Sequence, residues 1–147
     1  VGSEMCIRDS PDRMRECINA LAFQADWVLP GLEEGRFLTG EVTPEAIACF
    51  YRAQGAQLVV VKLGPDGAYY DSATQGCGHV PGFPVANVID TVGAGDGFAA
   101  GVISALLEGR GTLEAVQRGA WIGARAVQVL GDTEGLPTRA ELMEAGL

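Results

Sequence analysis

Apolar residues along the chain follow two patterns, helical spacing in some stretches and short continuous runs in others. The spacing from Met14 to Ala22 predicts an amphipathic helix over residues 12–24. The run at 58–61 has no polar position, which is typical of a strand buried on both faces. Similar apolar runs predict the strands of the domain, at residues 26–30, 57–63, 68–71 and 77–80.

Capping residues mark the starts of further helices. Thr43, directly before a proline, predicts a helix start. Thr112 is expected to cap a helix that reaches about Leu130. Thr138 has Glu141 three residues later, which predicts a capped terminal helix. Helices that alternate with strands in this way indicate an α/β domain with a mainly parallel sheet.

Composition and charge narrow the class of partner. The chain has 147 residues, 48% of them hydrophobic, which is enough for one globular core. Its net charge of −9 argues against nucleic acid and anionic membranes as partners. No apolar run is long enough to span a bilayer and no secretory leader is visible. The four cysteines form no metal-binding pattern, so we expect reduced thiols and a cytoplasmic protein.

The stretch with the clearest chemistry is DTVGAGD, residues 90–96. Strand-like residues 85–89 precede it and an apolar run follows it, which predicts a turn from a strand into a helix. The backbone N–H groups of Gly93, Ala94 and Gly95 would then surround a helix N-terminus, where anions bind. No lysine follows as in a P-loop, and Phe98 replaces the third glycine of a dinucleotide fingerprint.

A carboxylate beside an anion site changes what the turn can do. Asp96 follows the glycines directly, where it could accept a proton from an attacking hydroxyl. The turn therefore suggests phosphoryl transfer. The plainer alternative is a glycine-rich helix start in which Asp96 is only a favourable acid of the first turn.

DTVGAGD resembles the C-terminal signature of the ribokinase-like (PfkB-type) carbohydrate kinases. The resemblance implies an α/β, ribokinase-like three-layer sandwich with a mainly parallel sheet. It implies that Asp96 is the catalytic base and that Gly93, Ala94 and Gly95 form the anion hole for the transferred phosphoryl group. It also implies that Asp90 and Thr91 organise the phosphate and metal region, including a site for a monovalent cation such as K⁺.

Two other stretches agree with this family. In DWVLPGLEEGRFLTG, Glu34 matches a glutamate that helps to hold Mg²⁺, whereas Gly31 stands where the family has asparagine. The alternative for Glu34 is a solvated helix acid. In VKLGPDG, Gly64 and Gly67 match a turn beside the nucleotide phosphates and ribose. Lys62 could neutralise phosphate charge there, or it could simply reach solvent from the end of the strand.

A further stretch, GAWIGARAVQVLGDTEGLPT, matches the family's helix and loop beside the adenine. Ala120 stands where an asparagine is frequent, so packing and backbone would have to hold the base there. Trp121 could stack on the base, but a packing role is the stronger interpretation for an aromatic residue in a helix.

The resemblance implies ATP-dependent phosphorylation of a sugar or sugar-acid hydroxyl with Mg²⁺. The sequence of these stretches is most similar to the 2-keto-3-deoxygluconate kinase branch of the family. A ribokinase-, fructokinase- or nucleoside-kinase-type activity and a non-catalytic nucleotide-binding fragment are the alternatives. Asp96 favours catalysis, because binding alone needs no carboxylate, whereas Gly31 and Ala120 favour the non-catalytic alternative. Whether the full-length protein forms a homo-oligomer stays open.

The resemblance covers residues 12–147, about half of a family member. We therefore interpret residues 11–147 as the C-terminal part of a PfkB-type kinase domain, with most sugar contacts in the absent half and little activity alone. The first ten residues, VGSEMCIRDS, have no structural period and are similar to a translated sequencing adapter. We interpret residues 1–10 as an artefact, with a short native linker as the alternative.

Overall fold

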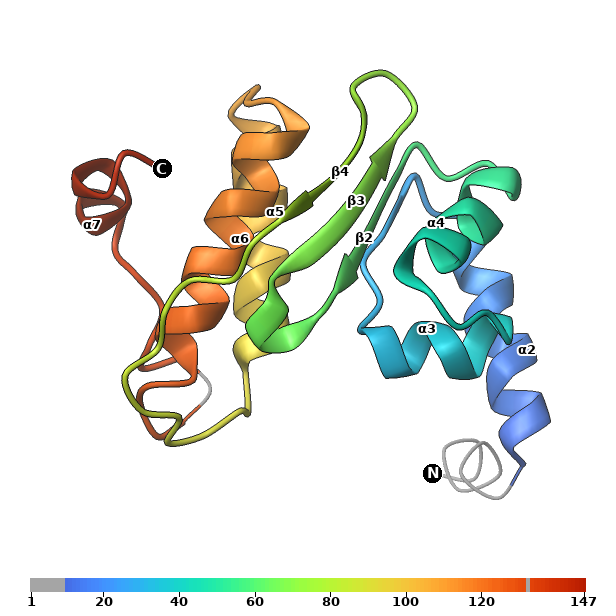
Figure 1. Cartoon of the computed structure of the whole chain (residues 1–147), viewed down its shortest axis with the longest axis horizontal. Coiled ribbons are helices and arrows are strands. Elements are labelled where there is room, and N and C mark those ends of the chain that lie inside the picture. Colours follow the sequence, from blue (N-terminus) through green and yellow to red (C-terminus); the bar gives the residue numbers. More distant parts are fainter. Residues whose placement is uncertain (1–9, 132) are drawn as a thin grey trace.

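A four-stranded sheet forms the middle of three layers in the computed structural model, which describes residues 10–131 and 133–147 (Figure 1). Helices α2, α3 and α4 lie on one side of the sheet, and α5 and α6 lie on the other. The elements in chain order are α2 (Pro11–Ala22), β1 (Trp27–Val28), α3 (Leu32–Thr39), α4 (Pro44–Ala53), β2 (Leu58–Lys62), η1 (Gly64–Asp66), β3 (Ala68–Ser72), β4 (Gly76–Val80), α5 (Ala94–Leu107), α6 (Thr112–Ala126) and α7 (Arg139–Glu144). The α/β class and the three layers are as expected.

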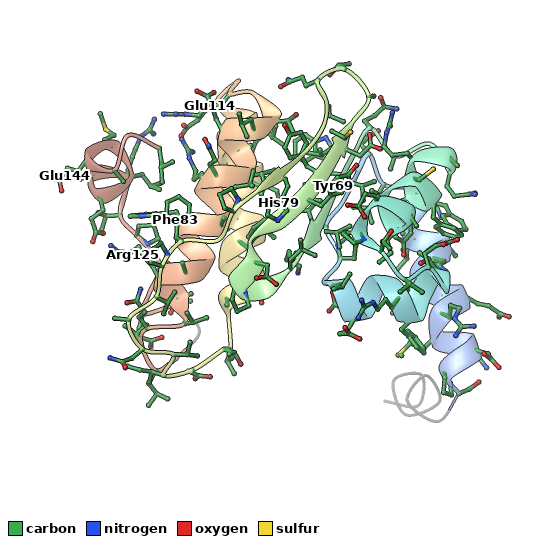
Figure 2. The ribbon with its side chains drawn as sticks, in the orientation of Figure 1. Tyr69, His79, Phe83, Glu114, Arg125 and Glu144 are labelled. Atoms are coloured by element: carbon green, nitrogen blue, oxygen red, sulfur yellow. The ribbon has the colours of Figure 1, made fainter. Side chains whose placement is uncertain are left out.

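The sheet is mixed, which corrects the expectation of a mainly parallel sheet for the described residues. Its order is β1-β2-β3-β4, and only β1 and β2 are parallel. The connections from β2 to β3 and from β3 to β4 are a few residues long, whereas a parallel pair needs a crossover of about a dozen residues or more. These strands therefore pair as hairpins, with Tyr69 opposite His79 (Figure 2).

Strand β2 supplies both cores because its side chains alternate between the two faces of the sheet. Val59 and Val61 pack toward α4, against Ile47 and Tyr51. Leu58 and Val60 face the other core, whose helical members come from α5 and α6. All four residues are buried, as expected from the unbroken apolar run.

Helices α5 and α6 approach closely because glycines line their contact. A β-carbon on Gly101 would lie 2.8 Å from the Cα of Gly119, and one on Gly119 would lie 2.8 Å from the carbonyl oxygen of Phe98. Both obstacles are backbone atoms, which cannot move aside alone. The close approach fixes how the first turn of α5 sits relative to α6.

Replacing Gly101 with Val is therefore expected to lower the free energy of unfolding by about 3 kcal/mol, because the added carbons force the two helices apart. Ala100 is exposed on the same helix, so Ala100→Val is the matched control and should cost about 0.5 kcal/mol through helix propensity alone. Urea denaturation of both variants measures the difference. Equal costs would show that the contact between α5 and α6 is looser than these distances indicate.

The predicted caps are confirmed at two of three helices. Thr43 accepts a hydrogen bond from the Ala46 N–H, and Thr138 accepts one from the Glu141 N–H. Thr112 is instead the first residue of α6, buried at 3% exposure, and Gly111 is the cap. At this helix start the Glu114 carboxylate accepts from the Gly111 N–H at 3.2 Å, and the Gln75 side-chain oxygen accepts from the Thr112 N–H at 2.8 Å. The helix also ends at Ala126, earlier than expected.

The segment before the signature is not a strand, which corrects a second expectation. Residues 81–91 have no regular structure, and Val88 and Ile89 are more than half exposed. Within residues 10–131 and 133–147 no strand pairs with this segment, and the Ile89 N–H donates instead to the Val127 carbonyl after α6. Two prolines, Pro81 and Pro84, also remove donors that a sheet would need.

No helix within residues 10–131 and 133–147 is long and apolar enough to cross a membrane. The interpretation of residues 1–10 as an artefact concerns a segment that, except for Ser10, lies outside the described residues. Ser10 itself caps α2, accepting a hydrogen bond from the Arg13 N–H.

Candidate functional site

The signature forms the N-terminus of α5. Gly93 is its cap, in the left-handed conformation with φ 76°, where a side chain would be strained. Its carbonyl accepts from the Gly97 N–H at 2.8 Å, so the helix begins at once. The N–H groups of Gly95 and Asp96 lie in the first turn, where the helix offers them no acceptor. The turn is therefore a helix N-terminus, as expected from the sequence, and helix N-termini are places where anions can bind.

Lys62 approaches this turn from the end of β2. Its Nζ lies 3.4 Å from the position that a β-carbon on Gly95 would occupy. Within residues 10–131 and 133–147, no carboxylate forms an ion pair with this ammonium. A cation beside the positive end of a helix is unfavourable unless an anion lies between them. The two positive groups together therefore favour a site for phosphate.

Asp96 is exposed and lies next to Gly95, in the first turn of α5. In the part of the chain that the structure describes, its side chain makes no hydrogen bond and no ion pair. Its carboxylate is thus available to a ligand.

Asp90 holds the turn in place. One carboxylate oxygen accepts from the Val92 N–H at 3.0 Å, and the other accepts from the Gly131 N–H at 3.4 Å. The side chain therefore joins the signature to the loop after α6. Thr91 contributes its carbonyl, which accepts from the Ala94 N–H at 3.4 Å, while its side chain is exposed. No motif in the sequence indicates Gly131 as a partner of Asp90.

Glu34 lies in the first turn of α3, which begins directly after Gly31. The backbone of Gly31 pairs with that of Lys62, and the Gly31 N–H donates to Glu34 Oε2 at 2.6 Å. The Glu34 side chain is exposed, with its other oxygen free of hydrogen bonds within the described residues. No group of three or more metal-ligating side chains occurs there. One carboxylate could thus support a metal ion whose other ligands are phosphate and water.

The two glycines after Lys62 have different surroundings. A β-carbon on Gly67 would lie 2.0 Å from the Val80 carbonyl oxygen, so this glycine is needed where the chain crosses the end of β4. Gly64 has φ 60° and open space around it. A ligand can approach Gly64, whereas the close approach alone explains Gly67. Gly82 completes the crossing, since its β-carbon would meet the Pro65 carbonyl at 2.0 Å.

Ala120 does not lie on the surface near the signature turn at the N-terminus of α5. It lies in the core cluster of α5, α6 and the sheet, 8% exposed, so little of it is available to a nucleotide. Trp121 is partly exposed, and the guanidinium of Arg125 lies 5.0 Å from its ring centre. This stacked pair agrees with a packing role for Trp121.

An ion pair at the C-terminal end of α5 stabilises the fold. Arg118, 2% exposed, donates to Glu108 Oε2 at 2.8 Å and to the Ser104 hydroxyl at 3.2 Å. The hydrogen bond from Arg118 is the main cause that lowers the pKa of Glu108. The three residues join the C-terminal end of α5 to α6, so the helix is held at both ends.

The similarities of the chain to known proteins agree with this geometry. Residues 2–139 match the family model described as pfkB family carbohydrate kinase. The chain is 54% identical over 134 residues to 2-dehydro-3-deoxygluconokinase of Bacillus subtilis (strain 168), covering 90% of this chain and 41% of that protein.

Solved structures show the same fold. The crystal structure of a PfkB protein from Polaromonas sp. JS666 superposes with a TM-score of 0.79 at 66% identity, over 91% of this chain and 41% of that one. A putative ribokinase II from E. coli in complex with ATP and Mg²⁺ gives a TM-score of 0.81 at 31% identity, over 90% and 42%. The chain thus spans about two fifths of these relatives. Its fold is ribokinase-like, and the chain belongs to the pfkB family of carbohydrate kinases.

Proposed function

We propose that this chain is the nucleotide-binding and catalytic-base part of a kinase that uses ATP to phosphorylate 2-keto-3-deoxygluconate at its 6-hydroxyl. The observation that carries the proposal is the meeting of Lys62 with Gly95 beside the exposed carboxylate of Asp96. A binding module needs the two positive groups alone. The free carboxylate adds a proton acceptor where an acceptor hydroxyl would approach the phosphate.

The residues divide the reaction between them. The N–H groups of the first turn of α5 and the Lys62 ammonium stabilise the charge that spreads over the oxygens of the transferred phosphoryl group. Asp96 takes the proton of the sugar hydroxyl as the new bond from oxygen to phosphorus forms and the bond to the ADP oxygen breaks. Asp90 keeps the turn attached to the loop at Gly131, so these groups stay in position.

Mg²⁺ fits this site as a companion of the nucleotide. It would be bound mainly by phosphate oxygens and water, and it would neutralise phosphate charge. Glu34 is the residue that we assign to its support, since one of its oxygens has no hydrogen bond within the described residues. Asp90, whose two oxygens already accept backbone N–H groups, would have to share them with Mg²⁺ or a monovalent cation such as K⁺.

The substrate rests on the relative that shares 54% of the matched residues and is named a 2-dehydro-3-deoxygluconokinase. We place most of the sugar contacts outside this chain, because it spans 41% of that relative. Ribose, fructose and a nucleoside remain the alternative acceptors. We also propose that the enzyme is cytoplasmic, where ATP and such substrates occur.

The test is an assay of the protein encoded by the complete source gene, with ATP and 2-keto-3-deoxygluconate, ribose, fructose or adenosine. We expect kcat/KM for 2-keto-3-deoxygluconate to exceed the others by roughly 100-fold, as expected when a site is built to bind polar groups of one substrate. The 147-residue chain alone should show no turnover. A preference for another acceptor would correct the substrate, and nucleotide binding without any turnover would establish a non-catalytic protein.

A further inference from the structure

A second cluster of charge lies at the C-terminal end of α5, away from the signature turn. Helix α5 has 14 residues, so its two ends lie roughly 20 Å apart. Glu108 follows the helix directly and forms ion pairs with three arginines, Arg118 at 2.8 Å, Arg110 at 3.7 Å and Arg139 at 3.8 Å. These arginines come from α6, from the loop between α5 and α6, and from α7. The cluster thus joins three segments of the chain around one carboxylate.

The positive charge of this cluster exceeds its negative charge. Three guanidinium groups share one carboxylate, which leaves two positive charges without a counterion. Within residues 10–131 and 133–147, no carboxylate other than that of Glu108 forms an ion pair with these arginines. The acids of α7 do not compensate them, since Glu141 pairs with Arg125 and Glu144 does not line the space among the arginines. Like charges this close repel one another unless an anion lies among them.

The arginines also have hydrogen-bond donors that the protein does not use. Arg118 is 2% exposed, and its Nε–H, which is buried, has no acceptor among the described residues. Arg110 and Arg139 reach Glu108 only at ion-pair distance, and neither guanidinium makes a hydrogen bond in the same part of the chain. A buried donor without an acceptor costs about 1–3 kcal/mol. The cluster therefore favours a ligand that accepts hydrogen bonds.

A pocket of about 180 Å³ lies among these side chains. Glu108 and the three arginines line it, together with Leu142, Met143 and Leu147 from α7 and the residues after it. The pocket thus has a cationic side and an apolar side. Its volume is below the roughly 300 Å³ at which sites for drug-sized ligands begin, so a ligand that fits it is small.

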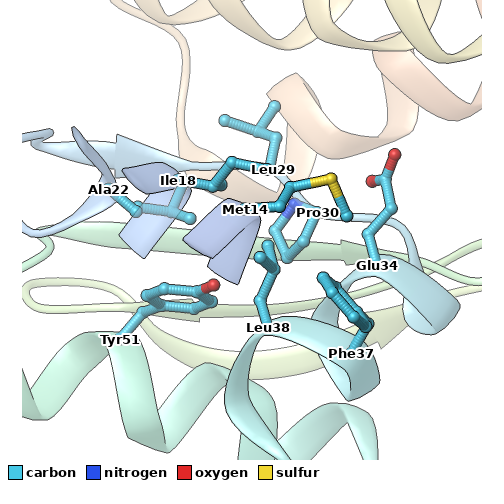
Figure 3. Close-up of a pocket in the computed structure, with 10 residues that line it drawn as sticks. Met14, Ile18, Ala22, Leu29, Pro30, Glu34, Phe37, Leu38 and Tyr51 are labelled. Carbon is cyan, nitrogen blue, oxygen red and sulfur yellow. The ribbon is translucent and has the colours of Figure 1, made fainter. Parts of the chain in front are cut away.

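A larger pocket, of about 440 Å³, has a different character (Figure 3). It lies between α2, α3 and the end of β1, and apolar side chains such as Met14, Ile18 and Phe37 line most of it. Among the described residues that line it, Glu34 is the only charged one. A negatively charged ligand is therefore favoured in the pocket beside Glu108 and disfavoured in the larger one.

We propose that the pocket at the C-terminal end of α5 binds a small monocarboxylate with a short apolar chain. A guanidinium can donate to both oxygens of a carboxylate, so the charged end of the ligand lies among Arg110, Arg118 and Arg139. Its apolar chain lies against Leu142 and Met143. Inorganic phosphate fits less well, because the apolar side of the pocket would then contact polar oxygens. The site is separate from the signature turn, so it does not depend on the proposed kinase activity.

The test is titration calorimetry of the product of the complete source gene with isovalerate, a branched monocarboxylate. We expect isovalerate to bind, and isovaleramide, which has nearly the same shape without the charge, to bind at least about tenfold more weakly. Arg110→Gln should raise the Kd for isovalerate roughly tenfold, since it removes a charged donor. Arg13→Gln is the matched control: it removes an exposed arginine from α2, outside the pocket, and should leave the Kd unchanged.

Circular dichroism establishes that the variants are folded. Arg139→Gln is a second variant if Arg110→Gln unfolds, because the Arg139 side chain is 83% exposed, and it should raise the Kd roughly fivefold. The proposal is overturned if isovalerate does not bind, if isovaleramide or inorganic phosphate binds as tightly, or if Arg13→Gln weakens binding as much as Arg110→Gln. Weaker binding in Lys62→Met would also overturn it, since the probe would then occupy the signature turn.

Discussion

Replacing Asp96 with Asn in the product of the complete source gene is expected to lower kcat by roughly 10²- to 10⁴-fold, which is the usual contribution of a positioned general base. Asparagine has nearly the same shape but cannot accept the proton of the sugar hydroxyl. The phosphate contacts come from backbone N–H groups and Lys62, so ATP affinity should remain unchanged. Steady-state kinetics and calorimetry with an ATP analogue measure the two quantities separately.

The control for this variant is Asp12→Asn. Asp12 is also an exposed acid in the first turn of a helix, but it lies on α2, with its side chain 87% exposed and 3.6 Å from Arg15. Its replacement should leave kcat unchanged. If Asp96→Asn retains turnover near that of Asp12→Asn, Asp96 is only a favourable acid of the first turn, and the assignment of the base is wrong.

The sequence predicted those parts of the site that depend on residues close together along the chain. Glycines at 93 and 95 and a carboxylate at 96 allow few structures other than a helix N-terminus with an acid in its first turn. The cap of α4 at Thr43 was similarly local. The charge of Lys62 at the end of an apolar strand suggested a phosphate contact as one of two interpretations, and the structure brings Lys62 Nζ to Gly95.

Features that depend on contacts distant in sequence could not be predicted. Residues 85–89 have the composition of a strand, but strand formation needs a partner, and Ile89 pairs with the carbonyl of Val127 instead. The close approach of Gly67 to backbone atoms of residues 80–82 is likewise not indicated by its own segment, VKLGPDG. The link from Asp90 to Gly131 joins residues 41 positions apart, and no local pattern indicates such a pair.

Lys62 is the only lysine of the chain. The other side chains that are always positively charged are arginines, so the one that faces the α5 N-terminus differs from all of them. A lysine ammonium is a compact point charge on a flexible stem, suited to following phosphate oxygens that move during transfer, whereas a guanidinium favours one fixed bidentate geometry. Its place beside Gly95 therefore makes it the side chain on which nucleotide affinity should depend most.

Lys62→Met is expected to raise the Kd for ATP by roughly 10- to 150-fold, the equivalent of one charge-assisted hydrogen bond of about 1.5–3 kcal/mol. Methionine keeps the length of the side chain and its packing at the end of β2 while it removes the charge. Lys62→Arg should recover part of the affinity. Arg13→Met, which removes an exposed cation from α2, should not change it.

The solitary lysine also allows a direct observation of contact. Reductive methylation with ¹³C-formaldehyde labels Lys62 and the N-terminal amine of this chain, so its NMR spectrum holds one lysine signal. If phosphate lies between Lys62 and the first turn of α5, ATP should shift that signal, and Lys62→Met should abolish it. A lysine signal unmoved by saturating ATP, with Kd unchanged in Lys62→Met, would mean that Lys62 reaches solvent. The α5 N-terminus would then bind phosphate without it, because the dipole and N–H groups of the helix do not depend on the side chain.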